Sequence, residues 1–267
     1  MAITTLDGAI AGMQAPRLFA KTASGTLVAG RPHTWWALAG SPGAGSYDAT
    51  LNGATLSSSS TVPNGAIPHT DPVSGNAYLA RLSGMATQTG LLMLCDRLWQ
   101  NRPANASGAQ AITSPTWPAR DASASTNGDG VLLAVEFSTA QTAGTATCAV
   151  TYTNSAGTGS KTANLLDAIT ATTAVGSFLR LDLQAGDQGC RSVQSVNFSA
   201  TSTGGVWNLV AYRVLATLEM QANVPNAIDV LTSGMPRLPN GVVPFLVFVP
   251  STTTATSATG VYLETQG

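Results

Sequence analysis

The stretch TYTNSAGTGSKTANL, residues Thr151–Leu165, decides the fold class of this chain. It contains Gly-Ser-Lys-Thr, which resembles the end of a phosphate-binding loop in nucleotide-binding enzymes. That loop needs a glycine directly before the lysine and another at its start, because backbone N–H groups must curl around the phosphates. Here Ser160 precedes Lys161, and Ser155 stands at the earlier position. Both required glycines are missing, so the stretch favours a turn between two strands.

The residues before this turn alternate between apolar and small polar side chains. One face of the segment 145–152 carries Ala146, Cys148, Val150 and Tyr152. A period of two predicts a half-buried strand. Asn154–Gly157 then supplies turn residues, with Gly157 free to adopt positive φ. The following segment, 158–165, is predicted to return as the partner strand of a β-hairpin.

Further strand patterns run along the chain, at 78–82, 91–99, 131–137, 178–183, 193–198, 206–218, 242–249 and 260–264. Leu and Met also favour helix in Gly90–Asn101, but Gly90 and the Thr/Gly link before it favour a strand. Pro244 indicates an edge or a bulge in its strand. A single helical turn is expected in Asn164–Thr170.

These patterns predict an all-β fold, an antiparallel β-sandwich of jelly-roll type or two stacked β subdomains, with little helix. We expect an N-terminal arm or short helix in 1–30, a loop-rich β region in 31–115 and a β-sandwich region in 116–267. Leu6, Ile10 and Met13 are spaced for one helix face, and Thr5 is placed to cap it. Long Gly/Pro/Ser-rich loops fill residues 40–72.

The composition is low in charge. Charged residues make up 9% of the chain, against about 25% in ordinary soluble domains. The apolar content of 44% argues against disorder. A net charge of −1 favours association, so we expect a homo-oligomer or a large assembly. No positive stripe is visible, which predicts no direct contact with nucleic acid.

The three cysteines, Cys95, Cys148 and Cys190, stand far apart, which argues against a disulfide framework and a zinc site. No run of 18 apolar residues and no export signal is visible in the sequence. We therefore expect no membrane contact and assembly in a cytoplasm.

Motifs for catalysis are lacking. The two histidines, His33 and His69, are expected in loops, and no Gly-x-Ser-x-Gly elbow accompanies them. Ser125–Gly130 resembles a calcium loop but holds one aspartate, so a tight turn is the favoured interpretation. The sequence predicts no catalytic residue, no cofactor and no metal, and hence a protein that is not an enzyme.

Four segments resemble virion structural proteins of tailed bacteriophages. They are Gly90–Asn101, Trp117–Phe137, Thr147–Leu165 and Phe178–Val196, and together they cover about half of the chain. The resemblance implies a multi-copy β protein bound to a capsid, a collar or a tail. It brings no catalytic residues with it.

The expected function is a capsid decoration or cement protein of a phage head, located in the virion and assembled in the cytoplasm of a host bacterium. Its expected partners are copies of itself and the major capsid or neighbouring virion proteins. The alternatives are a tail, collar or baseplate ring component and a host-glycan-binding module. Tryptophan and arginine are the usual energetic centres of interfaces, so the candidate interface residues are Trp35, Trp36, Arg31 and Trp99.

Overall fold

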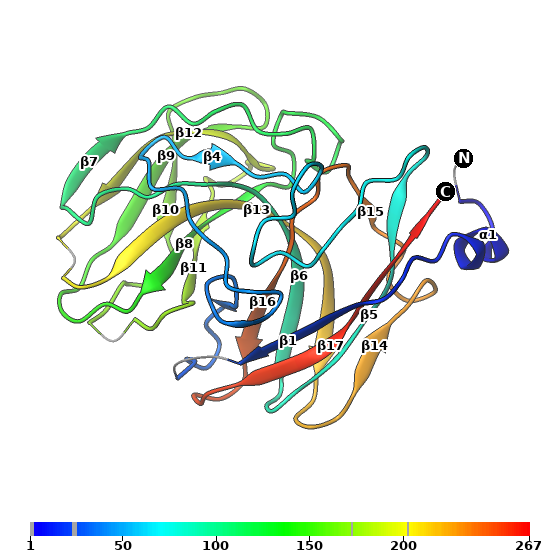
Figure 1. Cartoon of the computed structure of the whole chain (residues 1–267). Coiled ribbons are helices and arrows are strands. Elements are labelled where there is room, and N and C mark those ends of the chain that lie inside the picture. The colour runs from blue at the N-terminus through cyan, green and yellow to red at the C-terminus, as the bar shows by residue number, and fades with distance from the viewer. Residues whose placement is uncertain (1–2, 23–25, 172, 202) are drawn as a thin grey trace.

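The computed structural model describes residues 3–22, 26–171, 173–201 and 203–267 (Figure 1). The elements in chain order are α1 (Leu6–Ala11), β1 (Arg17–Thr22), β2 (His33–Thr34), β3 (Gly40–Ser41), β4 (Ala54–Thr55), β5 (Ala77–Ala86), β6 (Gly90–Gln100), β7 (Gly108–Ala111), β8 (Leu132–Thr139), β9 (Cys148–Asn154), β10 (Lys161–Leu165), β11 (Phe178–Asp182), β12 (Cys190–Phe198), β13 (Val206–Met220), β14 (Asn226–Ile228), β15 (Arg237–Leu238), β16 (Pro244–Pro250) and β17 (Ser257–Gln266). Strands dominate, which confirms the all-β prediction.

The strands form two antiparallel sheets. One has six strands in the order β14-β5-β17-β1-β3, with β15 also paired to β5. The other has eleven, in the order β2-β16-β6-β13-β8-β11-β10-β9-β12-β7, with β4 also paired to β6. The six-stranded sheet packs over β16, β6 and β13, and their side chains share one buried cluster. This sandwich-like arrangement confirms the predicted β-sandwich class.

The hairpin predicted from the opening stretch is present as β9 and β10. Cys148, Val150 and Tyr152 are buried, and their neighbours Ala149 and Thr151 are half-buried. The turn closes with a hydrogen bond of 2.9 Å from the Gly157 N–H to the Asn154 carbonyl oxygen. Gly157 has a φ of 85°, as the turn chemistry requires.

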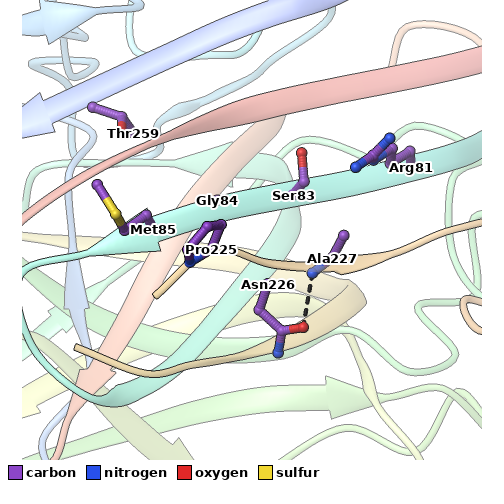
Figure 2. A pocket seen from close by; sticks show the side chains of 8 residues that line it. All are labelled: Arg81, Ser83, Gly84, Met85, Pro225, Asn226, Ala227 and Thr259. Carbon is purple, nitrogen blue, oxygen red and sulfur yellow. Dashed lines mark hydrogen bonds between the residues drawn. The ribbon is translucent and has the colours of Figure 1, made fainter. Parts of the chain in front are cut away.

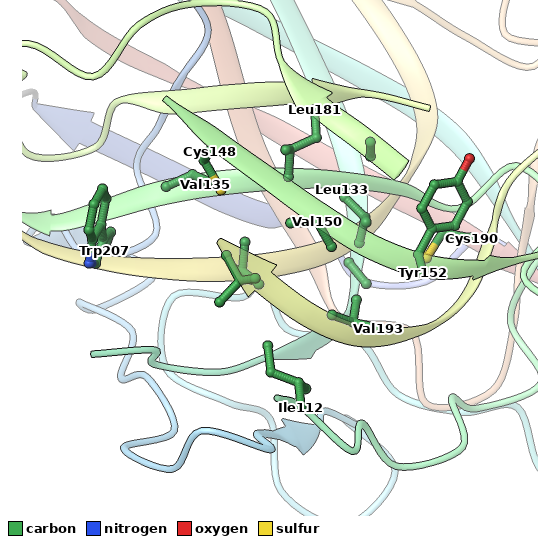
Figure 3. Close-up of a cluster of buried hydrophobic side chains, with 14 of the residues drawn as sticks. Ile112, Leu133, Val135, Cys148, Val150, Tyr152, Leu181, Cys190, Val193 and Trp207 are labelled. Atoms are coloured by element: carbon green, nitrogen blue, oxygen red, sulfur yellow. The ribbon is translucent and has the colours of Figure 1, made fainter. Parts of the chain in front are cut away.

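Two hydrophobic cores lie at opposite ends of the long strands β6 and β13. The upper core fills the curl of the eleven-stranded sheet, with Leu133, Val150, Val193 and Trp207 among its members (Figure 3). The lower core lies between the two sheets and includes Phe19, Leu82, Leu94, Leu218, Phe248 and Tyr262. Strands β6 and β13 contribute side chains to both cores and thereby join them.

A bulge in β13 keeps its apolar side chains directed at both cores. Trp207 and Leu209 enter the upper core, whereas Leu218 and Met220 enter the lower core. The register against β6 shifts between Val214 and Ala216, where β13 holds one extra residue. An extra residue changes which positions face inward, since side chains alternate along a strand. The odd-numbered apolar positions above the bulge therefore give way to even-numbered ones below it.

A third cluster lies on the opposite face of β6, β13 and β16. It contains Trp36, Cys95, Phe178, Val210, Tyr212, Phe245 and Val247. Tyr47, Leu56 and Val62 from the segment between β3 and β5 pack against it. The Gly/Pro/Ser-rich region thus covers a sheet face that would otherwise expose aromatic residues.

Several local predictions are confirmed and others are wrong. Helix α1 starts after Thr5, whose hydroxyl oxygen accepts from the Gly8 N–H at 3.1 Å, as predicted. Pro244 opens β16, where its missing N–H costs no ladder hydrogen bond. The helical turn expected in Asn164–Thr170 is wrong, because Asn164 and Leu165 pair with β11 as part of β10. His33 lies in a short strand instead of a loop.

The division of the chain at residues 30/31 and 115/116 stays a prediction. Strand pairing crosses both positions, since β1 pairs with β17 and β6 pairs with β13.

Candidate functional site

The candidate interface tryptophans are core residues of the folded chain. Trp35 and Trp36 are each 1% exposed, and Trp99 is 0% exposed. Trp35 stacks on Phe248 with ring centroids 5.5 Å apart, and Trp99 packs against Trp117 at 6.3 Å. Arg31 is half-buried. The interface role of these four residues stays a prediction, and the burial of the tryptophans gives it no support.

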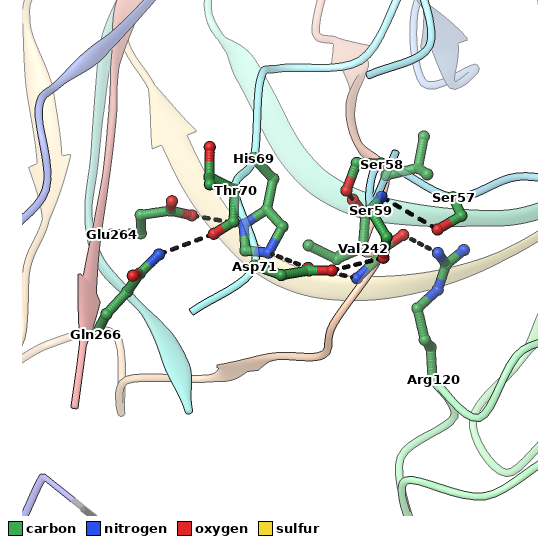
Figure 4. A network of polar contacts seen from close by, with 12 residues as sticks. Ser57, Ser58, Ser59, His69, Thr70, Asp71, Arg120, Val242, Glu264 and Gln266 are labelled. Carbon is green, nitrogen blue, oxygen red and sulfur yellow. Dashed lines mark hydrogen bonds and ion pairs between the residues drawn. The ribbon is translucent and has the colours of Figure 1, made fainter. Parts of the chain in front are cut away.

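The chemically versatile side chains gather instead in a polar network, which we call the seam; Figure 4 shows its members His69, Asp71, Arg120 and Glu264. It comprises His69, Asp71, Asp96, Arg120 and Glu264. All but Asp71 are nearly fully buried. Asp96 comes from β6 and Glu264 from β17, so the seam joins the two sheets. Its remaining members lie on loops.

His69 is held between two carboxylates. Its Nδ1 lies 2.7 Å from Glu264 Oε2, and its Nε2 lies 3.2 Å from Asp71 Oδ1. The His69 side chain is 0% exposed. A catalytic histidine must turn one ring nitrogen toward a substrate or a nucleophile. Both nitrogens of His69 already face carboxylates, so this cluster resembles a catalytic triad in composition but not in geometry.

Asp71 connects the histidine to two loops. Its Oδ1 accepts from the Gly241 N–H at 2.6 Å, and its Oδ2 accepts from the Ser59 hydroxyl at 2.5 Å. Burial tends to raise the pKa of Asp71, but the hydrogen bonds from Ser59 and Gly241 outweigh it and lower that pKa below its usual value. The serine hydroxyl bonds to the aspartate and not to the histidine, which again differs from a nucleophile–base pair.

Arg120 and Asp96 form the second half of the seam. Arg120 Nε lies 3.2 Å from Asp96 Oδ2, and the guanidinium also donates to the carbonyl oxygens of Arg97 and Gly241. Asp96 Oδ1 accepts from the Val243 N–H at 2.9 Å. Burial raises the pKa of Asp96 and lowers that of Arg120, and each partner's charge opposes this effect. These contacts fix β6 to the loops at residues 120 and 241.

A further ion pair links β6 to β8 on the other face of the eleven-stranded sheet. Arg97 Nη2 lies 2.6 Å from Glu136 Oε2, and both side chains are 0% exposed. The guanidinium of Arg97 lies over the Trp36 ring, 4.4 Å from its centroid. Such a buried pair is an internal link between β6 and β8, inaccessible to a substrate.

The stretch Ser125–Gly130 forms the tight turn that the sequence favoured. The carboxylate of Asp121 accepts from the backbone N–H groups of Ser125, Gly128 and Asp129 at 2.6, 2.9 and 3.1 Å. Burial tends to raise the pKa of Asp121, and these hydrogen bonds lower it overall. Within the described ranges, no group of three His, Cys, Asp or Glu residues is placed to hold a metal ion.

Several large apolar side chains are exposed on the surface of the molecule. Leu6 and Ile10 on α1 are 51% and 56% exposed, and Leu18 on β1 is 66% exposed. Leu231, near α1, is 79% exposed. In the part of the chain that the structure describes, no helix has the length and apolar character needed to cross a membrane.

No protein-family model and no curated protein matches this chain. Among solved structures, it matches the VP2 subviral particle of infectious bursal disease virus with 9% identity and a TM-score of 0.20, over 96% of this chain and 81% of that one. It matches the Gx strain structure of this virus with 11% identity and a TM-score of 0.17, over 95% and 80% of the two chains. A further match is the T13 particle of this virus, with 12% identity and a TM-score of 0.20, over 99% of this chain and 60% of that one. At such TM-scores the likeness carries no argument about the function of this chain.

Proposed function

We propose that this chain is a non-enzymatic virion structural protein that decorates and stabilises a phage head by contacts with neighbouring subunits. The observation that carries the proposal is the placement of its polar and apolar groups. The histidine and carboxylates of the seam are held by one another inside the fold, whereas apolar residues of α1 and β1 stand exposed. Exposed apolar groups with little charge around them favour contact with other proteins.

The mechanism is stabilisation linked to binding. A protein that binds the assembled shell and not the separate subunits shifts the equilibrium toward the shell. A rigid binder serves this purpose best, because little conformational entropy is lost when it docks. The long strands β6 and β13, which join both cores, supply such rigidity.

The glycan-binding alternative receives less support. Sugar-binding clefts use exposed aromatic and polar groups that converge on the ligand. All five tryptophans of this chain are at most 2% exposed, so none of them offers a stacking platform.

The test compares shells assembled with and without this protein. We expect shells without it to lose their contents at a lower temperature on heating, and at a higher remaining ionic strength on dilution of the salt, than complete shells. Added purified protein should restore the resistance of complete shells. Leu18→Ser is expected to weaken this rescue, whereas Val73→Ser, at a fully exposed loop position, serves as the matched control. Equal resistance of both kinds of shell would overturn the proposal.

A further inference from the structure

The outer face of the six-stranded sheet is open to solvent and largely uncharged. Leu18 pairs with Val261, and Val261 pairs with Ser83, so these three side chains form a row across β1, β17 and β5. Met85 on β5 is 39% exposed and Leu18 is 66% exposed. A sheet face that meets only water normally carries polar side chains.

A shallow groove of about 620 Å³ crosses this face between β5 and the segment 225–227 (Figure 2). It is lined by Arg81, Ser83, Gly84, Met85, Pro225, Asn226, Ala227 and Thr259. Small residues form much of the lining, and Met85 and Pro225 add apolar surface. Arg81 is the one charged residue among them. The groove therefore suits an apolar side chain that is accompanied by a negative charge.

The side chain of Arg81 forms no ion pair with any described residue. The exposed Asp229 lies near enough for the charge of Arg81 to act on it. However, Asp229 Oδ1 already accepts from the N–H groups of Leu231 and Thr232, at 3.0 and 3.2 Å, and from the Thr232 hydroxyl. The guanidinium donors of Arg81 remain available to a carboxylate.

Helix α1 has the complementary character. Leu6 and Ile10 project from it with more than half of their surface exposed, at 51% and 56%. Asp7, also exposed, is the single charged residue in the helix sequence LDGAIA. It lies one residue from Leu6 and three from Ile10, so the carboxylate borders the apolar pair. Its side chain forms no ion pair with any described residue.

The helix is anchored where it cannot reach the groove of its own chain. The Thr265 hydroxyl donates to the Ala9 carbonyl oxygen at 2.6 Å, and the Gln266 N–H donates to the Gly12 carbonyl oxygen at 3.0 Å. The groove is lined by Thr259, which precedes Thr265 by six residues on the same strand. Six strand residues span about 20 Å. An occupant with the character of α1 must come from another molecule.

We propose that α1 of one copy docks into the β5–β14 groove of a second copy, with Leu6 and Ile10 on its apolar lining and Asp7 paired with Arg81. The segment 224–235 borders both features, because Ala227 lines the groove and Leu231 lies beside α1. Two copies related by a two-fold axis can therefore each place α1 in the groove of the other copy, which closes the assembly as a dimer. This contact goes beyond attachment to a shell and does not depend on it.

The test is sedimentation equilibrium of the full chain over a range of concentrations at low salt. The wild-type protein is expected to shift with concentration from 27.1 kDa to twice that mass. Asp7→Lys and Arg81→Glu should each weaken the dimer about fivefold or more, because either change removes both symmetry-related Asp7–Arg81 ion pairs and places like charges together. The double variant restores the pair with reversed charges and should recover most of the affinity. Leu6→Ser/Ile10→Ser should weaken it further, and Val73→Ser should leave it unchanged.

Circular dichroism of each variant checks that the fold is retained, since all these side chains are exposed. A wild-type protein that stays monomeric at all concentrations would overturn the proposal and leave other proteins as the partners of both surfaces. A dimer that the double variant fails to restore after both single changes weaken it would equally exclude the Asp7–Arg81 contact.

Discussion

The seam and the outer face of the six-stranded sheet differ in the side chains that they bury and expose. The seam places His69, Asp96, Arg120 and Glu264 out of contact with water, at 2% exposure or less. The outer face shows Leu18 and Met85 to the solvent, at 66% and 39%. Charged side chains usually stay outside unless they are paired, and a buried charge needs its partner. Several of the few charged side chains of this protein thus form buried contacts within the fold, whereas apolar side chains remain exposed for contact with other proteins.

We therefore expect substitutions in the seam to lower the free energy of unfolding, and substitutions on the outer face to change only contacts with other molecules. The same expectation of lost stability applies to His33, a buried polar side chain on β2 outside the seam.

Arg120→Met should cost about 3–5 kcal/mol of unfolding free energy, because it leaves Asp96 buried without its partner. Two carbonyl oxygens, of Arg97 and Gly241, also lose a donor. Urea denaturation measures the loss. The double variant Asp96→Asn/Arg120→Met should be less destabilised than the sum of the two single variants. Additive losses would mean that the two side chains do not act as a pair.

Acid should destabilise the protein through His33, which is buried beside β16. Burial, assisted by the charge of Arg31, lowers the pKa of His33 from 6.5 to about 4. Its Nε2 accepts from the Val28 N–H at 3.1 Å, which requires the neutral ring. The unfolded chain therefore binds a proton that the folded chain does not, between pH 6.5 and about 4.

The stability contributed by neutral His33 is complete above pH 6.5 and is lost as the pH falls toward 4, by up to about 3 kcal/mol. Urea denaturation at a series of pH values measures this slope. His33→Gln keeps an acceptor without a titrating group, so its stability should depend less on pH in this window. An identical pH dependence in the variant would exclude His33 as the cause.

His69→Ala should cost about 2–3 kcal/mol, because it removes the closer of the two side chains that hydrogen-bond to the buried Glu264 carboxylate. Tyr262, whose hydroxyl donates to Glu264 Oε2 at 3.2 Å, supplies partial compensation. The midpoint of urea denaturation at pH 7 measures the effect. A change below about 0.5 kcal/mol, as is typical of surface positions, would show that His69 does not tie the loop to β17.

Leu18→Ser should change the unfolding free energy by no more than about 0.5 kcal/mol, because the side chain is mostly exposed. Leu82→Ser, on the buried side of the same sheet, is the matched comparison and should lose several kcal/mol. A large loss from Leu18→Ser would mean that the outer face belongs to the fold and is not a contact surface.

The sequence predicts the strands well where one face is buried and the other is not. The alternation before Asn154 gave the correct face of β9, and Thr5 marked the start of α1. Prediction failed where both faces are buried. In β11, Phe178 and Leu179 both lie in buried clusters on opposite faces of the sheet, whereas the pattern at 178–183 predicted only that a strand is present. A local pattern cannot show a second layer that arrives from elsewhere in the chain.

The seam was out of reach for the same reason. His69 and Asp71 were visible as neighbours, but the partner Glu264 follows 195 residues later. Nothing local marks Glu264, which sits in an ordinary strand pattern. The tryptophans show the converse problem, because a large aromatic residue suits a core and an interface equally well. Only the fold distinguishes Trp35, stacked on Phe248, from an exposed anchor.

The most direct test of the central claim is cryo-electron microscopy of the assembled particle, with the position of this chain determined at side-chain resolution. We expect the chain to be part of the particle, with α1 and the outer face of the six-stranded sheet covered by neighbouring subunits. We also expect the seam to stay buried within the chain. A particle without this chain would exclude the proposed role, and so would one in which Leu18 and Ile10 face solvent while other surfaces make the contacts.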